Sequence, residues 1–564
     1  MLHPLLDVSS LNVVISVLGL YILLFGFISL KIKQKWYIGE ALPAFVIGVA
    51  LGPVGTKFLS VDQWGGEDDN KKSEIAYGLT RLVIGIQLVK VGYELPKRYL
   101  RQRVVEMTIC LLPLMTISWL STSACIMLIV PRISYLASLI IASCITCTDP
   151  ILSQAIAKGP FSDNYVRRPL REFMSAEAGG NDGFGFPFLL LAVSLLRYAD
   201  TPANTVSMEE FDLARGVPDF LGASDVGRFG GGASRALKHW AVEGVFYMII
   251  MGTGYGAFVG FISRKLFNLA SRRRWIDNEC FRLVPVALGL FIVGTCGCVG
   301  SDETLACFVA GSTLNWDGLY HAETQARHDS FNSTIETLMN FGTFIYLGAV
   351  MPWDQFHMPD TTEITITRLF ALGFLILAFR RIPAIMLGYR FMPKVCDTWR
   401  EALFMGYFGP IGVGAISYVE YARRLFPGPG KSDREINNLT ASMTPVVYWL
   451  VFFSIVVHGL SVPILNILYR IFKVPRICDH PVEIILLSEN EPLPSNSTIG
   501  PQRHSVIVNN QFPRASDEDE ESNSTDEDRT NILHGSESRS RSRSSCSIEQ
   551  PPTKEAAVDT REMV

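Results

Sequence analysis

Two acidic residues, Glu177 and Asp182, lie inside one long apolar segment of the chain, residues 173–197. A carboxylate at the centre of a membrane span costs about 2.5 to 3.5 kcal/mol on insertion scales, so a functional role is its first interpretation. Desolvation disfavours the charged form, and such a carboxylate then holds either a proton or a cation. Oxygen atoms of Asn181 and Thr148, with backbone carbonyls, would complete the ligands of a hard cation such as Na+. The pattern indicates exchange chemistry at Asp182.

Glu177 and Asp182 are five positions apart, so their side chains leave a helix on different faces. Glu177 therefore needs a partner of its own, and Arg380 and Arg381 interrupt another apolar segment with the opposite charge. We expect one of these two arginines to form a buried ion pair with Glu177. In the alternative, both arginines lie at the end of their span and extend to the membrane interface.

Two further apolar segments carry residues that break a helix. Pro150, in the sequence Thr148-Asp149-Pro150, removes a backbone donor. Residues 406–414 are interrupted in the same way by Gly409, Pro410 and Gly412. Carbonyls freed at bilayer depth are tolerated where they line a cavity or are buried in protein, so paired breaks indicate a transport site where the two segments cross. The alternative is a plain proline kink, or close helix packing through glycine.

Three more acidic residues are candidates for the same site. Asp149 either supplies a ligand to the cation or neutralises the dipoles of half-helices that begin at the crossing. Asp302 and Glu303 stand at the start of a later apolar segment. There they either cap a helix N-terminus or belong to the cation path.

The elements that position these residues are membrane spans. The chain has 564 residues, of which 48% are hydrophobic, and the apolar residues fall into long runs. The first run lacks the basic start and the cleavage site of a signal peptide. We expect an all-α polytopic membrane protein with about 13 spans. They lie near residues 11–30, 38–56, 75–95, 104–130, 134–157, 173–197, 236–263, 280–298, 300–315, 331–351, 366–390, 398–423 and 442–472.

The two broken spans occupy matching places in the chain. Spans one to six and eight to thirteen form two sets, and the break falls in the fifth span of each. This predicts two inverted six-helix repeats with crossed discontinuous helices. Lysine and arginine concentrate in the loops after odd-numbered spans, which predicts an outside N-terminus and a cytoplasmic C-terminus.

The region after the spans has a different composition. We predict a transmembrane domain at residues 1–475 and a cytoplasmic, mostly disordered tail at residues 476–564. The tail is rich in Ser, Glu, Asp, Pro and Arg and buries too little apolar area to offset the entropy of ordering. Its Arg-Ser run is interpreted as a solvated, phosphorylatable segment. The formal net charge of −4 and the lack of a basic face argue against nucleic-acid binding.

Taken together, these motifs resemble one family, the fungal plasma-membrane Na+/H+ antiporters of the monovalent cation:proton antiporter superfamily. The resemblance covers residues 10–475 and rests on Thr148-Asp149-Pro150, on Glu177 to Asp182 with the following Gly-Phe-Gly-Phe-Pro-Phe, and on Phe408 to Gly414. It implies a homodimer whose core subdomain moves against a dimerisation subdomain, with the ion site at Asp182. It also implies that Asp302 and Glu303 modulate transport. Glu303, where relatives often have Asp, and Ala178, where many have a hydroxyl residue, depart from the pattern.

The function expected from these residues is secondary antiport of Na+ or Li+ against H+, with K+ as a further candidate cation. The resemblance adds salt tolerance and pH homeostasis as cellular roles. We expect no enzyme activity and no cofactor. The alternatives are a K+/H+ exchanger, a cation channel, and an intramembrane aspartyl protease built on Asp149 and Asp182. The protease would need Tyr-Asp and Gly-x-Gly-Asp motifs, which neither aspartate carries.

Overall fold

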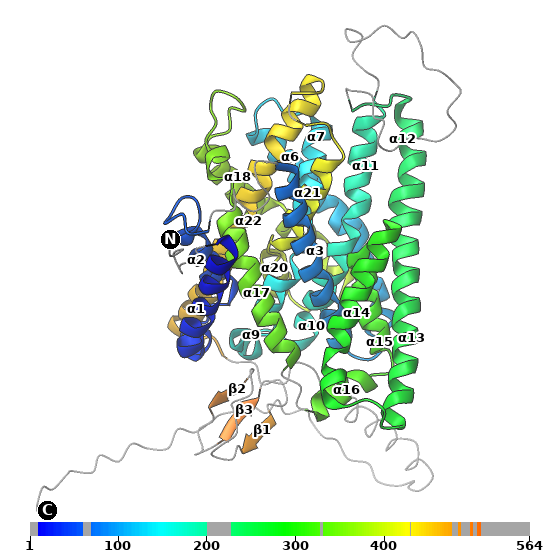
Figure 1. The fold of residues 1–564 in the computed structure, drawn as a ribbon, viewed down its shortest axis with the longest axis vertical. Helices are drawn as coiled ribbons and strands as arrows, with labels where there is room; N and C mark the ends of the chain where they lie inside the picture. The colour runs from blue at the N-terminus through cyan, green and yellow to red at the C-terminus, as the bar shows by residue number, and fades with distance from the viewer. Residues whose placement is uncertain are drawn as a thin grey trace, which may run out of the picture.

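The computed structural model of the chain describes residues 9–59, 69–199, 227–327, 331–428 and 430–475, with three short strands further on. The helices run side by side in an elongated bundle (Figure 1). In chain order the helical elements are α1 (Ser10–Leu30), η1 (Lys31–Lys35), α2 (Ala41–Leu51), α3 (Asp69–Glu94), α4 (Tyr99–Gln102), α5 (Val104–Ile109), η3 (Cys110–Leu114), α6 (Met115–Ile129), α7 (Tyr135–Thr146), α8 (Pro150–Ala157), α9 (Pro160–Tyr165), α10 (Arg168–Phe184) and α11 (Phe186–Arg197). They continue with α12 (Gly232–Trp240), η4 (Ala241–Met251), α13 (Gly252–Arg272), α14 (Asn278–Val299), α15 (Glu303–Leu314), α16 (Leu319–Ala326), α17 (Phe331–Val350), η5 (Trp353–Phe356), α18 (Ile366–Phe379), α19 (Ile382–Gly388), η6 (Tyr389–Phe391), α20 (Trp399–Tyr407), α21 (Val413–Arg424) and α22 (Arg434–Ile471).

Many of these helices have the length and composition of membrane spans. In the described part of the chain, 8 helical segments are long and apolar enough to cross a bilayer, and a bent pair raises the number to 9. Each span predicted from the sequence overlaps at least one helix. The all-helical, polytopic fold is therefore confirmed. The count of thirteen spans and the inverted repeat stay predictions, because α2 and α15, with 11 and 12 residues, are shorter than a full crossing requires.

The two predicted breaks are present, and they touch. Residues 147–149 separate α7 from α8, and the two helices are bent by 43°. Pro150 opens α8, where a missing N–H costs nothing because the first turn has no intrahelical acceptor for it. Residues 408–412 separate α20 from α21. The Asp149 N–H donates to the Pro410 carbonyl over 2.9 Å, so the irregular segments lie directly against each other.

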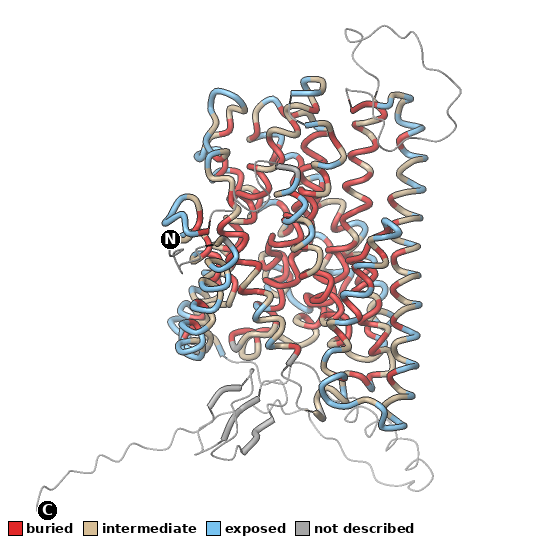
Figure 2. The backbone as a smooth tube through the Cα atoms, viewed as in Figure 1, coloured by how far each residue is buried: buried red, intermediate tan, exposed pale blue. Residues whose placement is uncertain are grey.

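Helix α3 lies at the centre of the bundle. It contacts α14, α15, α17 and α21, and Figure 2 shows buried residues along the central helices and exposed ones along α1 and α13. Glycines bring α3 and α15 together backbone to backbone. A methyl group on Gly311 would lie 2.1 Å from the Val89 carbonyl oxygen, and one on Gly92 would lie 2.4 Å from the Phe308 carbonyl oxygen. Small residues of this kind let membrane helices approach closely.

A short turn separates the eighth and ninth predicted spans, where the sequence leaves little room for a loop. Helix α14 ends at Val299 and α15 begins at Glu303. Gly300 makes the reversal possible with φ of 76°, a left-handed conformation that side-chain-bearing residues rarely adopt.

Three strands follow the helical bundle. They are β1 (Glu483–Leu486), β2 (Ser497–Ile499) and β3 (Ser505–Val508), and they form an antiparallel sheet in the order β1-β3-β2. The composition of the tail does not predict this sheet. The rest of the predicted tail, including the Arg-Ser run, lies outside the described residues, so its disorder and the domain boundary at residue 475 stay predictions.

Candidate functional site

Asp149 lies at the crossing, between the starts of two half-helices. Its Oδ2 atom accepts a hydrogen bond of 2.9 Å from the Leu152 N–H in the first turn of α8. Its Oδ1 atom accepts one of 2.7 Å from the Val413 N–H at the first residue of α21. The N-terminal ends of both half-helices carry partial positive charge, so one buried carboxylate neutralises both. These contacts match the second of the two roles that the sequence left open for Asp149.

Arg380 holds the opposite ends of the broken helices. Its guanidinium donates to the carbonyls of Ile145 and Cys147, over 2.7 and 3.2 Å, and to the carbonyl of Gly409. These carbonyls lie at and just beyond the ends of α7 and α20, where intrahelical donors run out. The crossing therefore holds an anion at the N-terminal ends and a cation at the C-terminal ends, as the helix dipoles require.

Glu177 pairs with Arg381 and not with Arg380. The Arg381 guanidinium donates two parallel hydrogen bonds to the Glu177 carboxylate, of 2.8 and 2.7 Å. Both residues are buried. The bidentate geometry is the strongest form of this interaction, and it joins α10 to the start of α19. The alternative that both arginines extend to the membrane interface is wrong, because both are at least nine-tenths buried.

Asn181 ties α10 to the break between α7 and α8. Its amide nitrogen donates to the Thr148 hydroxyl and to the Glu177 carboxylate, each over 2.7 Å. Its amide oxygen accepts the Thr148 N–H over 3.1 Å. The Thr148 hydroxyl oxygen accepts one hydrogen bond in this arrangement and retains a further lone pair.

Asp182 differs from Asp149, Glu177 and Asn181, whose side-chain oxygens all accept hydrogen bonds. It is 1% exposed, and neither carboxylate oxygen has a hydrogen-bond partner among the described residues. The nearby Tyr418 hydroxyl donates to the Asp182 backbone carbonyl and not to its side chain. A buried carboxylate without partners is costly unless it is protonated or meets a cation. Asp182 is thus the group at the crossing whose side-chain oxygens are not already engaged.

Glycines in the segment before and at the start of α21 make room for these side chains. A methyl group would lie 2.4 Å from Arg381 Cδ at Gly409, 2.5 Å from Asp149 Cγ at Gly412, and 2.3 Å from Asp182 Oδ1 at Gly414. Gly409 and Gly412, predicted only to break a helix, therefore also allow charged groups to approach the backbone closely, and Gly414 does the same for Asp182.

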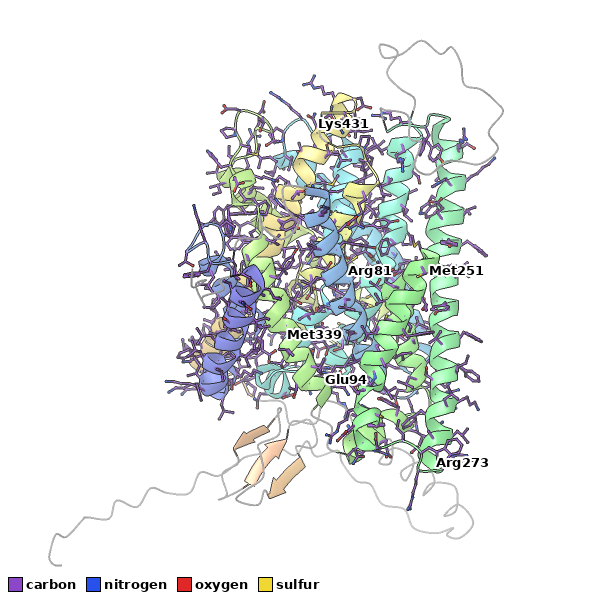
Figure 3. The ribbon with its side chains drawn as sticks, viewed as in Figure 1. Arg81, Glu94, Met251, Arg273, Met339 and Lys431 are labelled. Carbon is purple, nitrogen blue, oxygen red and sulfur yellow. The ribbon has the colours of Figure 1, made fainter. Side chains whose placement is uncertain are left out.

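Asp302 and Glu303 lie at the start of α15, which approaches α10 closely at Gly183, next to Asp182. Asp302 Oδ1 caps the helix, accepting the N–H groups of Thr304 and Leu305 over 2.9 and 3.0 Å, while Oδ2 has no hydrogen-bond partner in the described part of the chain. Glu303 pairs with Arg81 of α3 over 2.9 Å, and Figure 3 shows Arg81 at about the middle of the bundle. These contacts support the interpretation of Asp302 as a helix cap. A role for either residue in transport stays a prediction.

Residues 17–467 match the family model described as sodium/hydrogen exchanger, transmembrane. The chain belongs to this family.

Within the sodium/hydrogen exchanger family, the chain is similar to fungal proteins. It is 33% identical to the Na(+)/H(+) antiporter of Saccharomyces cerevisiae over 474 residues, which are 82% of this chain and 44% of that protein. It is 35% identical to a probable Na(+)/H(+) antiporter of Schizosaccharomyces pombe over 467 residues, 81% of this chain and 56% of that one. The chain thus spans about half the length of these curated relatives.

A solved structure of another protein has the same fold. The sodium proton antiporter MjNhaP1 from Methanocaldococcus jannaschii at pH 8 superimposes with a TM-score of 0.54 at 16% sequence identity. The match covers 81% of this chain and 100% of the archaeal one. At 16% identity, the likeness shows a shared arrangement of helices and nothing finer.

Three residues near the site were not assigned a role from the sequence. Gly414 and Tyr418 are four positions apart and therefore lie on one face of α21. Their position directly after the predicted break is the signal that could have placed both against Asp182. Glu420 is also buried, and it accepts hydrogen bonds from the Ser73 and Tyr448 hydroxyls over 2.5 and 2.9 Å. Its signal was a lone carboxylate in a largely apolar segment.

Proposed function

We propose that this chain exchanges Na+ for H+ across a membrane, with Asp182 as the ion-binding carboxylate. The observation that carries the proposal is the state of Asp182, which is buried at the crossing and has no hydrogen-bond partner for its side chain among the described residues. Na+/H+ antiport is also the activity in the names of the fungal relatives. We further propose that Li+ is carried, that K+ is a candidate, and that the protein acts in the plasma membrane as a homodimer.

Competition at one carboxylate couples the two ions. Protonation removes the negative charge that binds Na+, and a bound Na+ occupies the place where the proton would bind. The site therefore carries either Na+ or H+, never both, when it changes from one side of the membrane to the other. The Asp182 carboxylate provides the charge, and the free lone pair of Thr148 Oγ1 and the Asn181 amide oxygen are candidate neutral ligands. Both Asp149 oxygens accept backbone N–H groups, so we assign Asp149 to the helix ends and not to the cation.

Alternating access requires two bodies that move past each other. The ion pair of Glu177 with Arg381 and the contacts of Asp149 and Arg380 join α7, α8, α10, α19, α20 and α21 into one unit. Glycine contacts join α3 and α15 into another. We infer that the first unit is the moving core and that it slides along α3, with the N-terminus outside and the C-terminus cytoplasmic.

Purified protein in sealed liposomes tests this function. With an acidic lumen and a quenched pH-sensitive dye, addition of Na+ or Li+ is expected to restore fluorescence as protons leave. Potassium added in separate experiments ranks the cations and distinguishes an Na+/H+ from a K+/H+ exchanger. A cation channel would instead give a current at fixed pH. Absence of any response in vesicles of either orientation contradicts antiport.

Replacing Gly414 with alanine tests the position of Asp182 without removing it. The new methyl group would lie 2.3 Å from Asp182 Oδ1, so the carboxylate has to shift. We expect Na+-driven dequenching to fall roughly ten- to hundred-fold, as for other displacements of a reacting group by about 1 Å. The midpoint of thermal unfolding should change little, because alanine favours the helix by about 1 kcal/mol over glycine and offsets part of the crowding.

Gly294→Ala is the matched control. Gly294 lies on α14, and a methyl group there would meet nothing within 4 Å. This variant should transport at the wild-type rate. Equal loss in both variants would mean that Gly414 does not act through Asp182.

A further inference from the structure

Gln154 has a buried side-chain amide that nothing in the site explains. It lies on α8, is 5% exposed, and neither its amide nitrogen nor its amide oxygen has a hydrogen-bond partner among the described residues. An unpaired buried amide costs stability, so its presence calls for an explanation. Lys158, the residue that caps the C-terminal end of α8, is four positions further on and therefore lies on the same face of this helix. Because Lys158 pairs with Glu94, this face looks toward α3.

Ser175 repeats the pattern on α10. Its hydroxyl is 2% exposed and has no hydrogen-bond partner in the described part of the chain. Gly179, one turn further on, faces both α15 and α3, because a methyl group there would lie 2.6 Å from a Phe308 side-chain carbon and 3.1 Å from a Val91 side-chain carbon. Asp182 follows Gly179 by three positions, and Ser175 lies about 10 Å from it along the helix axis. The unpaired groups of α8 and α10 therefore border the same side of α3 as Asp182.

An ion pair stands at the far end of this border. Lys158 contacts Glu94 on α3, and Glu94 also lies 3.6 Å from Lys90. Figure 3 shows Glu94 below Arg81, toward the end of the bundle where Figure 1 shows α9. We call this end the α9 face. Lys158 belongs to the unit that holds Asp149, and Glu94 belongs to α3, so the pair connects the two bodies that the proposed function requires to move.

Resting on the proposed function, we propose that the Gln154 amide and the Ser175 hydroxyl line the route of the cation between Asp182 and the α9 face. The Glu94–Lys158 pair closes the mouth of this route. A cation that leaves water loses its hydration shell, and neutral oxygen atoms along the way replace part of it. The oxygens of Gln154 and Ser175 have no hydrogen-bond partner among the described residues and are therefore available. Separation of Lys158 from Glu94 opens the mouth as the core slides along α3.

Gln154→Leu tests the amide by combining transport with stability. Dequenching at low Na+ concentration should fall about tenfold or more, the size expected when a polar partner of a charged group is removed. The midpoint of thermal unfolding should not fall, because the substitution removes an unpaired polar group. Gln87→Leu is the matched control, since the Gln87 amide is buried but donates to Asn340 over 2.7 Å. That variant should lower the midpoint and keep transport per folded molecule near the wild-type value.

Cysteine labelling tests the route independently of transport. Gln154→Cys is made in a chain whose exposed Cys280 and Cys298, and Cys478 and Cys546 beyond the bundle, are replaced with serine. A positively charged, membrane-impermeant methanethiosulfonate reagent should label position 154 from the α9 face, and faster when Lys158→Met is added. In the second variant Glu94 keeps Lys90 as a neighbour. Gln87→Cys in the same background should stay unlabelled.

The outcomes separate the two proposals. Wild-type transport in Gln154→Leu, or labelling of position 154 only from the opposite face, overturns the route. A fall in both transport and thermal midpoint in Gln154→Leu assigns the amide a structural role and also overturns it. If the wild-type protein shows no cation-driven proton movement, the proposed function fails, while labelling still reports whether this face opens.

Discussion

Asp182→Asn is expected to abolish Na+-driven proton efflux, lowering its initial rate by at least about 100-fold, because one group holds both ions in turn. Asparagine keeps the size of the side chain, but its amide does not bind a proton at neutral pH and has no negative charge to neutralise a bound cation. The folded state should not suffer, since the wild-type carboxylate has no hydrogen-bond partner among the described residues. Fluorescence dequenching in liposomes and thermal unfolding in detergent measure the two effects on one preparation.

Asp360→Asn serves as the control for the loss of one negative charge. Asp360 is exposed in the segment between α17 and α18, and its replacement should leave transport at the wild-type rate. Residual exchange in Asp182→Asn above the level of empty liposomes would contradict the assignment. Asp302 would then be the next candidate, because its Oδ2 atom is also buried and has no hydrogen-bond partner in the described residues.

Arg381→Met is expected to cause the largest loss of stability, about 3 to 5 kcal/mol, the range measured when one partner of a buried ion pair is removed. Both hydrogen bonds to Glu177 disappear together with the one to the Met405 carbonyl. Among the described residues, the Glu177 charge then stays buried with the Asn181 amide as its one remaining hydrogen-bond partner. Chemical unfolding of the purified protein, or its yield and thermal midpoint where unfolding is irreversible, measures the effect.

The double variant Glu177→Met with Arg381→Met distinguishes a buried charge from lost packing. Removing both charges leaves no unpaired ion, so the double variant should be more stable than Arg381→Met alone. The control is Arg132→Met, which breaks an ion pair with Glu363 in which the side chains are 49% and 38% exposed. Exposed pairs contribute about 0 to 1 kcal/mol, so this variant should unfold near the wild-type midpoint. Equal losses of stability for Arg132→Met and Arg381→Met would contradict the prediction that breaking the buried Glu177–Arg381 pair costs more than breaking an exposed one.

Much of the molecule follows from local sequence. Long apolar runs locate the helices because unpaired backbone groups cannot be left in hydrocarbon. Pro150 and Pro410 locate the breaks because proline lacks the N–H that a continuous helix requires. Asp182 could be singled out for the same kind of reason, since a carboxylate at that depth is expensive unless it has a function. These conclusions depend on neighbours in the chain and need no knowledge of the fold.

The tertiary structure decided which groups meet. Arg380 and Arg381 are adjacent and have the same charge, and only the tertiary structure brings Arg381 to Glu177 and Arg380 to the broken helix ends. Asp149 is committed to the helix ends because α21 begins beside it, 264 positions away. The unpaired amide of Gln154 is likewise visible only once its surroundings are known. Sequence alone determined the helices, the breaks and the candidate carboxylate. Pairing, capping and the proposed cation route depend instead on contacts between residues far apart in the chain, whose geometry no local pattern encodes.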